Sequence, residues 1–556
     1  ASVFMIASEP LHHFVDDYLA YLHESNPTAS TFDGIHQFDD LLEDLSRSGI
    51  DAQVQALSGL ARRLAAISPD SLQGVERIER PMVATHIQSR LYDLEHVRLW
   101  ERNPQVYGEV LGSSLASQVL FDHAPAGDRA RRVLSKLRQA PRLIQSARDN
   151  IKDPPGIYVK NGLDTLRGTL RFIEVDLPRA VADVDDMGLL GDLADAQTEA
   201  IDALQSYMGY LETEVAPKAR ASFRLGADRF TEKMRLEEGL DLPLPRLLDI
   251  GLRELNSVQE EFKRVAGRLE NGDPIDVWRH VKTQHLATGG IVNTARQQIE
   301  QLATFIKRRD LVSFPAGEPV TVAPTPDFYR WTFASMWTPG PFESRPTRAY
   351  YYLTDVDPGW PEERKQDHLR DLNEATLWSI SIHEVYPGHF LHFQHLRQVE
   401  SRARKSLMMA SMSMVEGWAH YCEQMMQEEG FQKQNPVVHL GQLAESLIRI
   451  ARFVVAIRLH AEDLSVEQGV RFFRDEAFLE EGTARREAER GTFDPGYGSY
   501  TAGKLMMLKL REDYKAKVGD AFSLKAFHDA VLKNGVAPFP VHRQLMLGDG
   551  AGPAIE

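Results

Sequence analysis

The chain has almost no cysteine, with Cys422 as the single one in 556 residues. One cysteine cannot form a disulfide within the chain, and it cannot build the zinc sites that need several thiolates. This composition favours a reducing compartment. Any metal site in the protein must therefore be built mainly from His, Asp and Glu side chains.

Long apolar runs and an excess of basic charge are also missing. No segment approaches the ~18 consecutive apolar residues of a membrane-spanning helix, so we expect no membrane partner. The stretch Ser2–Ser8 is too short for a signal-peptide core and lacks a basic flank, which favours a cytoplasmic protein. The formal net charge of -16 repels phosphate backbones, so we expect no nucleic-acid partner.

Helical periodicity dominates what is present. Leu11, Phe14, Val15 and Tyr18 lie three or four positions apart or adjacent, as on one face of an amphipathic helix. The same spacing predicts helices over these segments: Val75–Trp100, Asp128–Asn150, Gly162–Val184, Leu189–Val215, Leu244–Leu269, Val277–Phe305, Pro361–Ile382, Ser406–Glu429, Pro436–Leu464 and Lys504–Val518. The fold is therefore predicted to be mainly α-helical.

Two segments interrupt the helical pattern. Val312–Leu353 is dense in proline and aromatic residues, and the aromatic run in Arg348–Thr354 predicts a short strand of a small β-sheet. Gly239–Pro245 separates two helical halves. We therefore expect an N-terminal helical lobe over residues 1–240 and a C-terminal lobe over residues 241–556, with one continuous domain as the alternative.

The motif HEVYPGH, at residues 383–389, bears the strongest chemical signal. A catalytic zinc needs about three protein ligands, an open position and a nearby general base. The HExxH pattern supplies two His at i and i+4 with the base beside the first. Here Pro387 stands at i+4, and His389 follows at i+6. On an unbroken helix, six residues rotate by about 240°, which would point the two rings apart.

Pro387 and Gly388 offer a way to bring the rings together. Proline cannot donate to the carbonyl of His383, and glycine tolerates unusual backbone angles. A helix break at this point would return His389 towards His383 and leave Glu384 as the general base. The alternative interpretation is a surface helix that carries ordinary polar histidines.

A third ligand is expected from the segment EGWAHY, at residues 416–421. Glu416 lies in an apolar, Met-rich helix, where an unpaired carboxylate is costly unless it binds a cation. His420 is one turn further on the same face and is a candidate contact to the site or the substrate. His392 and His395 continue the His spacing and are candidate competing ligands, with a supporting or surface position as the alternative for each. The alternative for Glu416 is an exposed position on an amphipathic helix.

A third segment, DPGYGSYTAGK at residues 494–504, predicts a Gly-rich turn before a helix that starts near Lys504. Tyr500 and Tyr497 are candidates to donate to a developing oxyanion. Arg486 and Arg490 are candidates to hold a carboxylate through two hydrogen bonds. A plain turn with aromatic packing is the alternative. The GxxxxGK spacing is attributed to chance, because leucine follows the lysine where a phosphate loop needs Ser or Thr.

At these residues the sequence resembles a large, mostly bacterial family catalogued as a domain of unknown function. Its members carry HExxPGH, then EGWAxY, then a late PGxxxxYxxG segment. The chain matches the first two at residues 383–389 and 416–421, and the third with a gap one residue shorter before Tyr500. Residues 26–30 and 34–36 also resemble the opening segment of the family, so the resemblance spans nearly the whole chain.

The family resembles helical zincins such as thimet oligopeptidase, the Taq-type carboxypeptidases and angiotensin-converting enzyme. That resemblance implies a mostly helical body around a deep cleft, with His383, His389 and Glu416 as metal ligands and Glu384 as base. It also implies a small sheet whose edge strand, Arg348–Thr354, aligns a peptide.

Tyr350 and Tyr351 of that strand, with Arg490 and Tyr497, are then the predicted substrate contacts. The chain departs from the family at His392 and Tyr497, where glutamine is common, and at Gly491, where an aromatic residue often stands.

These observations together predict a zinc metallopeptidase of short peptides. Zn²⁺ is expected to be held by His383, His389 and Glu416, with Glu384 as general base. Tyr500 and His420 are expected to stabilise the oxyanion. Two alternatives remain at this stage: a metallohydrolase of a non-peptide amide or ester, and a non-catalytic binding protein on the same fold. A helical scaffold protein is a weaker alternative.

Overall fold

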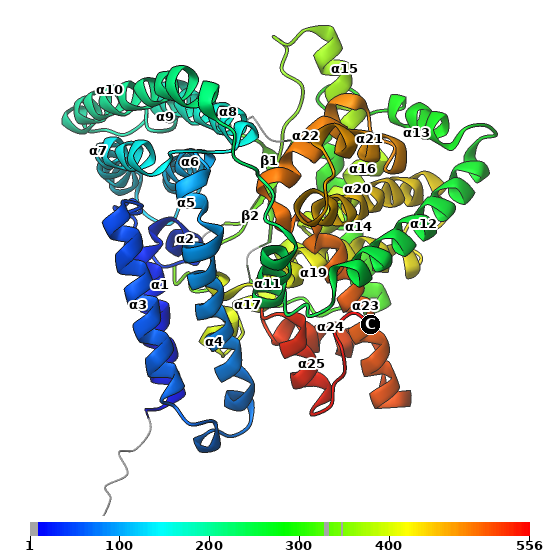
Figure 1. Cartoon of the computed structure of the whole chain (residues 1–556). Helices are drawn as coiled ribbons and strands as arrows, with labels where there is room; N and C mark the ends of the chain where they lie inside the picture. The colour runs from blue at the N-terminus through cyan, green and yellow to red at the C-terminus, as the bar shows by residue number, and fades with distance from the viewer. Residues whose placement is uncertain (1–8, 318, 327–332, 346–347) are drawn as a thin grey trace, which may run out of the picture. The chain divides into compact units, whose positions relative to one another are not determined.

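A computed structural model describes residues 9–317, 319–326, 333–345 and 348–556 (Figure 1). The chain folds into two compact units. The first unit comprises Ala1–Phe223, Pro339–Thr347 and Val399–Ala410, and the second comprises Arg224–Thr338, Arg348–Gln398 and Ser411–Glu556. Residues distant in sequence thus share one unit. The division into lobes at residue 240 stays a prediction.

Every element that the structure describes in the first unit is helical. Its α-helices are α1 (Leu11–Ser25), α2 (Pro27–Phe32), α3 (Arg47–Ala65), α4 (Val75–Tyr92), α5 (Leu99–Arg102), α6 (Gln105–Val119), α7 (Ala126–Asn150), α8 (Gly156–Arg171), α9 (Leu177–Ala180), α10 (Met187–Tyr210) and α18 (Arg402–Lys405). Short 3₁₀ and π segments lie at Pro69–Ser71, Asp93–Val97, Phe172–Asp176, Leu211–Val215, Ala216–Lys218 and Leu407–Met409.

Helix α7 illustrates how the first unit forms its core. Its apolar residues recur every three or four positions, and burying that stripe against α6 and α10 stabilises the helix more than its intrinsic propensity does. The buried stripe consists of Ala130, Val133, Leu137, Ala140, Ile144 and Ala147.

The second unit contains the remaining helices and the sheet. Its helices are α11 (Ala227–Glu238), α12 (Leu244–Leu269), α13 (Pro274–Thr283), α14 (Ile291–Arg309), α15 (Glu362–Asp371), α16 (Glu374–Glu384), α17 (His389–Leu396), α19 (Met412–Glu428), α20 (Pro436–Ala461), α21 (Val466–Glu476), α22 (Glu481–Phe493), α23 (Ser499–Val518), α24 (Leu524–Lys533) and α25 (Phe539–Leu547). Among the described residues of this unit, 3₁₀ turns lie at Pro495–Gly498 and Gly519–Ala521.

Helix α20 is the centre of the second unit. It packs against α12, α16, α22 and α23, and most of its side chains are buried. At one of these contacts, Gly251 of α12 lets Phe453 approach closely, because a Cβ at Gly251 would lie 2.6 Å from the phenylalanine ring. A helix whose side chains are buried on most of its faces is typical of a core position.

The small sheet lies in the second unit and has the order β1-β3-β2. Strand β1 (Thr321–Pro324) runs parallel to β3 (Tyr350–Leu353), and β2 (Ala334–Trp337) runs antiparallel to it. The prediction that Arg348–Thr354 supplies an edge strand for a peptide is therefore wrong. Both sides of β3 already pair with a neighbour, so its backbone has no free edge to offer.

The predicted mainly α-helical fold with a small sheet is confirmed. Several boundaries differ from the prediction. The expected helix over Val277–Phe305 is two helices, and the one expected over Pro361–Ile382 is divided at Leu372 and Asn373. Within the described residues, no helix has both the length and the apolar character that crossing a bilayer requires.

Candidate metal centre

The HEVYPGH motif contains a helix break. Helix α16 ends at Glu384, and α17 begins at His389. The N–H of Gly388 turns back to donate to the carbonyl of Ile382, at 3.0 Å. A Cβ at Gly388 would lie 1.8 Å from the carbonyl oxygen of His383, so this turn requires glycine.

Helix α19 fixes the turn from the other side. The indole N–H of Trp418 donates to the carbonyl of Pro387 at 2.9 Å. Trp418 is fully buried, so this bond forms in a place that water does not reach. The EGWAHY segment therefore supports the HEVYPGH segment directly, and Glu416 is presented two residues before this anchor.

Three side chains converge as a result. Nε2 of His383 and Nε2 of His389 each lie 3.2 Å from the same atom, Oε2 of Glu416. The two imidazole rings are nearly perpendicular, at 89°, with centroids 4.8 Å apart. One ligand atom from each of the three residues lies within 4.8 Å of the others. The structure thus brings together the three residues that the sequence proposed as ligands.

Glu423 lies behind His383 and orients it. Nδ1–H of His383 donates to Oε2 of Glu423 at 3.1 Å, and Nδ1–H of His420 donates to the same oxygen at 2.8 Å. With its Nδ1 proton held in this way, a neutral His383 presents the lone pair of Nε2 towards Glu416. Catalytic metal sites commonly hold their histidines through such a carboxylate.

The sequence analysis assigned no role to Glu423. A signal was present, because Glu423 lies seven positions after Glu416 and three after His420, on the same face of a buried helix.

The electrostatics of the centre call for positive charge. Burial alone would lower the pKa of His383, but its bonds to Glu416 and Glu423 outweigh burial and raise that pKa to about 10. Burial opposes ionisation of Glu416 as well, yet the nearby His389 and His383 hold its pKa well below the usual value. Burial opposes ionisation of Glu423 too, but the neighbouring His420 and His383 hold its pKa well below the usual value. Both carboxylates therefore stay ionised and require a cation or protons between them.

The centre opens into a cavity of about 360 Å³. Its lining is strongly polar and comes from α16, α17, α19, α20, α22 and α23. The lining residues are Ser379, Ile380, His383, Glu384, His389, Glu416, Glu423, Glu445, Arg449, Arg452, Arg490 and Tyr500. Glu384 thus shares the cavity with the three candidate ligands.

Arg449 and Arg452 were also missed from the sequence. They lie three residues apart in α20, a helix whose side chains are mostly buried, and that pairing was the available signal. By contrast, Arg490 was proposed as a substrate contact and does line the cavity.

Tyr500 reaches the centre from the first turn of α23. The helix begins at Ser499 rather than near Lys504, so Tyr500 is held by helical backbone instead of a loop. Its ring stacks near His383, with centroids 6.2 Å apart and an interplanar angle of 22°. Burial and the neighbouring Glu416 raise the pKa of the Tyr500 hydroxyl, so it remains a proton donor.

Some proposed residues lie away from the cavity. His420 is fully buried behind Glu423, so the prediction that it stabilises an oxyanion is corrected to a role in holding Glu423. Tyr351 is fully buried and its hydroxyl lies 3.0 Å from that of Ser381, and Tyr497 is 1% exposed. Neither can contact a substrate from this position. Tyr350 is half-buried and stacks on Tyr352 within the sheet.

The two competing histidines are held elsewhere. His395 lies with Nε2 2.7 Å from the carbonyl oxygen of Ser313, to which it donates. His392 is fully buried and packs against Trp418, and burial keeps its pKa well below the usual value. Neither belongs to a group of convergent ligand atoms among the described residues.

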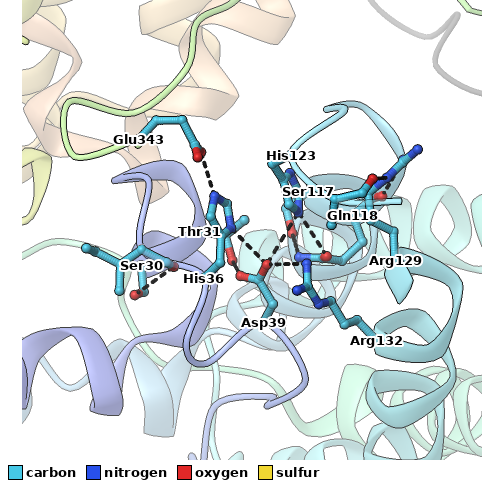
Figure 2. Close-up of polar contacts among 12 residues, drawn as sticks. Ser30, Thr31, His36, Asp39, Ser117, Gln118, His123, Arg129, Arg132 and Glu343 are labelled. Carbon is cyan, nitrogen blue, oxygen red and sulfur yellow. Dashed lines mark hydrogen bonds and ion pairs between the residues drawn. The ribbon is translucent and has the colours of Figure 1, made fainter. Parts of the chain in front are cut away.

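A second group with metal-ligand composition lies in the first unit. Figure 2 shows His36 and His123 pointing at Asp39. Nδ1 of His36 lies 2.9 Å, and Nε2 of His123 lies 3.3 Å, from Oδ2 of Asp39. The other nitrogen of His36 lies 2.5 Å from Oε2 of Glu343. The two imidazole rings stack in parallel, with centroids 4.3 Å apart.

This second group differs from the first in having a permanent cation of its own. The guanidinium of Arg132 donates to Oδ2 of Asp39 at 3.0 Å, and Thr31 donates to Oδ1 at 2.5 Å (Figure 2). Asp39 is therefore neutralised and fully hydrogen-bonded without a metal. Glu416 receives its two contacts from histidine nitrogens, which makes the second unit the better candidate for a metal centre.

Comparisons with known proteins found matches that cover nearly the whole chain. The family described as "Bacterial protein of unknown function (DUF885)" matches residues 27–546. A solved structure of "a putative lipoprotein of unknown function from Shewanella oneidensis" is 26% identical, with a TM-score of 0.80, and the match covers 97% of this chain and 100% of that one.

A second solved structure, "the putative lipoprotein from Colwellia psychrerythraea", shares the fold at 18% identity and a TM-score of 0.82. That match covers 98% of this chain and 99% of that one. The comparison with curated proteins found no match.

Proposed function

This chain belongs to the bacterial DUF885 family, and we propose that it is a zinc-dependent hydrolase, most simply a peptidase of short peptides. The observation that carries the proposal is the convergence of His383 and His389 on one oxygen of Glu416, at 3.2 Å each. Two His and one Glu form a donor set that catalytic zinc sites use.

The spacing of these atoms fits the proposed metal. Zinc bonds of about 2.0–2.2 Å in a tetrahedral arrangement separate neighbouring ligand atoms by about 3.3–3.6 Å. The two distances of 3.2 Å from Glu416 to the histidine nitrogens lie close to the short end of this range. The bond from His383 to Glu423 supplies the outer support that zinc-ligating histidines commonly have.

The chain's own residues then divide the work of hydrolysis. A bound Zn²⁺ would act as a Lewis acid on the scissile carbonyl and on water. Glu384 accepts a proton from the attacking water, whose oxygen bonds to the carbonyl carbon. Glu384 then passes that proton to the leaving amine as the C–N bond breaks. The Tyr500 hydroxyl donates to the oxygen of the carbonyl as negative charge develops there.

The cavity size supports a small substrate. Its volume of about 360 Å³ lies in the range of sites for small ligands, so short peptides or small amides fit better than folded proteins.

We also propose that the protein acts at the cell envelope. The description of the Shewanella oneidensis relative as a lipoprotein favours that location over the cytoplasm that the composition suggests. Fractionation of cells that express the full-length gene tests this point.

Metal analysis of the purified protein tests the function first. We expect one zinc per chain after dialysis against micromolar Zn²⁺, and its loss in His389→Ala. The matched control is His395→Gln, because His395 lies on the same helix but bonds to Ser313 instead. Absence of stoichiometric zinc from the wild-type protein would refute the proposal.

Activity is then measured on a library of short peptides beside a set of small amides and esters. Zinc-dependent cleavage of peptides supports a peptidase. Cleavage confined to the small amides or esters would keep the metal chemistry and replace the substrate class. A zinc-loaded protein that cleaves none of them would leave only a binding function.

A further inference from the structure

One wall of the metal cavity carries three arginines, Arg449, Arg452 and Arg490, which we call the arginine wall. Arg449 and Arg452 project from α20 one turn apart, and Arg490 projects from α22. A largely buried arginine pair is costly in a helix whose side chains are mostly buried, because each guanidinium loses most of its hydration. The wall therefore calls for an explanation beyond packing.

Carboxylates hold the arginine wall in place. The guanidinium of Arg452 binds Glu487 through Nε and Nη2, at 2.6 and 2.8 Å. Nη1 of Arg449 donates to Glu445. Nε of Arg490 donates to Asp494 at 3.0 Å. Each acid engages only part of its arginine, which fixes the plane of the guanidinium while other N–H groups remain for a ligand.

One of those donors is buried without a partner. Within the described part of the chain, no acceptor faces Nε of Arg449, although that atom is excluded from the surface. Buried N–H groups of charged side chains are rarely left in this state. Arg449 also lines the cavity, so its guanidinium has unused hydrogen-bonding capacity beside the space that a ligand would occupy.

Tyr500 connects the arginine wall to the metal centre. Its ring lies 5.6 Å from the guanidinium of Arg449 and 5.3 Å from that of Arg452, within the range of cation–π attraction. The same ring also stacks near the ring of His383, which is a candidate metal ligand. A group bound at the arginine wall therefore sits one aromatic ring away from the candidate ligands.

We propose that the arginine wall binds a carboxylate of the substrate, and that this carboxylate is the free C-terminus of a short peptide. Planar guanidinium groups match a carboxylate through paired hydrogen bonds, which suits an anion better than a neutral amide. In a cavity of about 360 Å³, a carboxylate held there keeps the scissile bond near the C-terminus. The protein is then a carboxypeptidase, an inference that rests on the proposed function.

Equilibrium binding separates the carboxylate from its neutral analogue. The zinc-loaded Glu384→Gln variant prevents turnover, and calorimetry compares three probes: acetyl-Ala-Ala-Phe, its C-terminal amide, and acetyl-Ala-Asp-Phe-amide. We expect the free acid to bind at least tenfold more tightly than either amide. If the third probe binds as tightly as the free acid, the wall reads a side-chain carboxylate and the C-terminal assignment is wrong.

Variants then assign the preference to the arginine wall. Adding Arg449→Met to Glu384→Gln should reduce the preference for the acid to less than threefold, and Arg449→Lys should restore part of it. Arg474→Met is the matched control, because Arg474 is an exposed arginine of α21 that pairs with Asp475 and Glu481. It should leave the preference unchanged.

Zinc content, measured on every variant, separates two failures. Equal binding of acid and amide by a zinc-loaded protein overturns the carboxypeptidase inference alone. A wild-type protein that binds no zinc overturns the proposed function, and this inference with it. Retention of zinc by Arg449→Met, together with loss of the preference, is the result expected if both proposals hold.

Discussion

Three glutamates surround the candidate centre, and their positions suggest three different tasks. Glu416 faces both histidine nitrogens, Glu423 lies behind the ring of His383, and Glu384 lines the cavity at the end of α16. Replacing each by glutamine keeps its shape and removes its charge. The three substitutions therefore distinguish a ligand, an orienting group and a base.

For Glu384, the substitution should affect catalysis and spare the metal. Glu384→Gln removes the group that accepts the water's proton, and general-base catalysis is worth about 10²–10⁴-fold. We expect kcat to fall by that factor while zinc stoichiometry and KM stay close to the wild-type values. Steady-state kinetics with metal analysis measure both. A decrease below fivefold, or loss of zinc, would assign Glu384 another role.

For Glu423, the substitution should affect the metal before the chemistry. Glu423→Gln loosens the ring of His383, and loss of such outer support typically costs 10–100-fold in metal affinity. Titration against a competing chelator measures this. Glu428→Gln is the control, because Glu428 lies on the same helix but is exposed and bonds to Arg511. Unchanged zinc affinity in Glu423→Gln would contradict the orienting role.

At the scale of elements, the site depends on how closely α19 and α23 approach. A Cβ at Gly417 would lie 2.5 Å from Cα of Gly503, and a Cβ at Gly503 would lie 2.1 Å from the carbonyl oxygen of Ser413. These backbone contacts set the position of Glu416 on one helix and of Tyr500 on the other. No side chain fits between the two helices at this point.

The packing of α19 on α23 predicts opposite effects for two similar substitutions. In an open helix, Gly→Ala stabilises by up to about 1 kcal/mol, and Gly267→Ala should do so, because nothing lies within 4 Å of a Cβ there. Gly503→Ala should instead destabilise by about 1–3 kcal/mol, as overpacking does, and weaken zinc binding. Denaturant unfolding and zinc titration test the pair. A stabilising Gly503→Ala would show that the helices separate easily.

The sequence predicted helices better than it predicted their ends. Apolar spacing found α12 over its full length, Leu244–Leu269, because one face is buried and the other exposed. It joined α15 to α16, although Asn373 caps the second helix through the N–H of Thr376 and could have marked the break. It also joined α13 to α14 across the Gly289-Gly290 pair, another stop signal that was present.

Strand order lay beyond the sequence for a different reason. The aromatic run at Tyr350–Leu353 indicated a strand. The two strands that pair with it lie earlier in the chain, and they pair with it through backbone atoms. Backbone pairing leaves little trace in side-chain pattern. The ligand motifs are local, so they could be recognised in the sequence. The roles of Arg449, Arg452 and Glu423 depend on how the helices pack, so the sequence alone did not predict them.

At the scale of the whole molecule, three separate segments of the chain form the first unit. His36 binds one of the two later segments. That residue reaches Glu343, which is 307 positions later in the chain, while its other nitrogen bonds to Asp39 (Figure 2). No sequence pattern marks a pair so far apart. The N–H of Phe342 also donates to the carbonyl of Asp33 at 3.0 Å, so backbone and side chains hold the same segment.

The stability of the interaction between His36 and Glu343 should depend on pH. Burial alone would lower the pKa of His36, but its bonds to Asp39 and Glu343 outweigh burial and raise the pKa from 6.5 to about 9. A raised pKa means that the folded state binds the proton more tightly than the unfolded state. The stabilisation is therefore fully present below about pH 6.5 and is lost as the pH rises through about 9. The shift corresponds to about 3 kcal/mol at most, and solvent screening of the partly exposed ring reduces this to about 1–2 kcal/mol.

Amide hydrogen exchange in residues 339–345, corrected for the intrinsic rate at each pH, measures the effect where it arises. Protection in the wild-type protein should fall between about pH 7 and 9.5. His36→Gln should be less protected at pH 7 and should change little over that range, because the titrating cation is gone. The control is His280→Gln, since His280 pairs with Glu270 at an exposed site where ion pairs contribute little. If the wild-type protein and His36→Gln lose protection in parallel, another group holds residues 339–345 in place, and the charge on His36 does not.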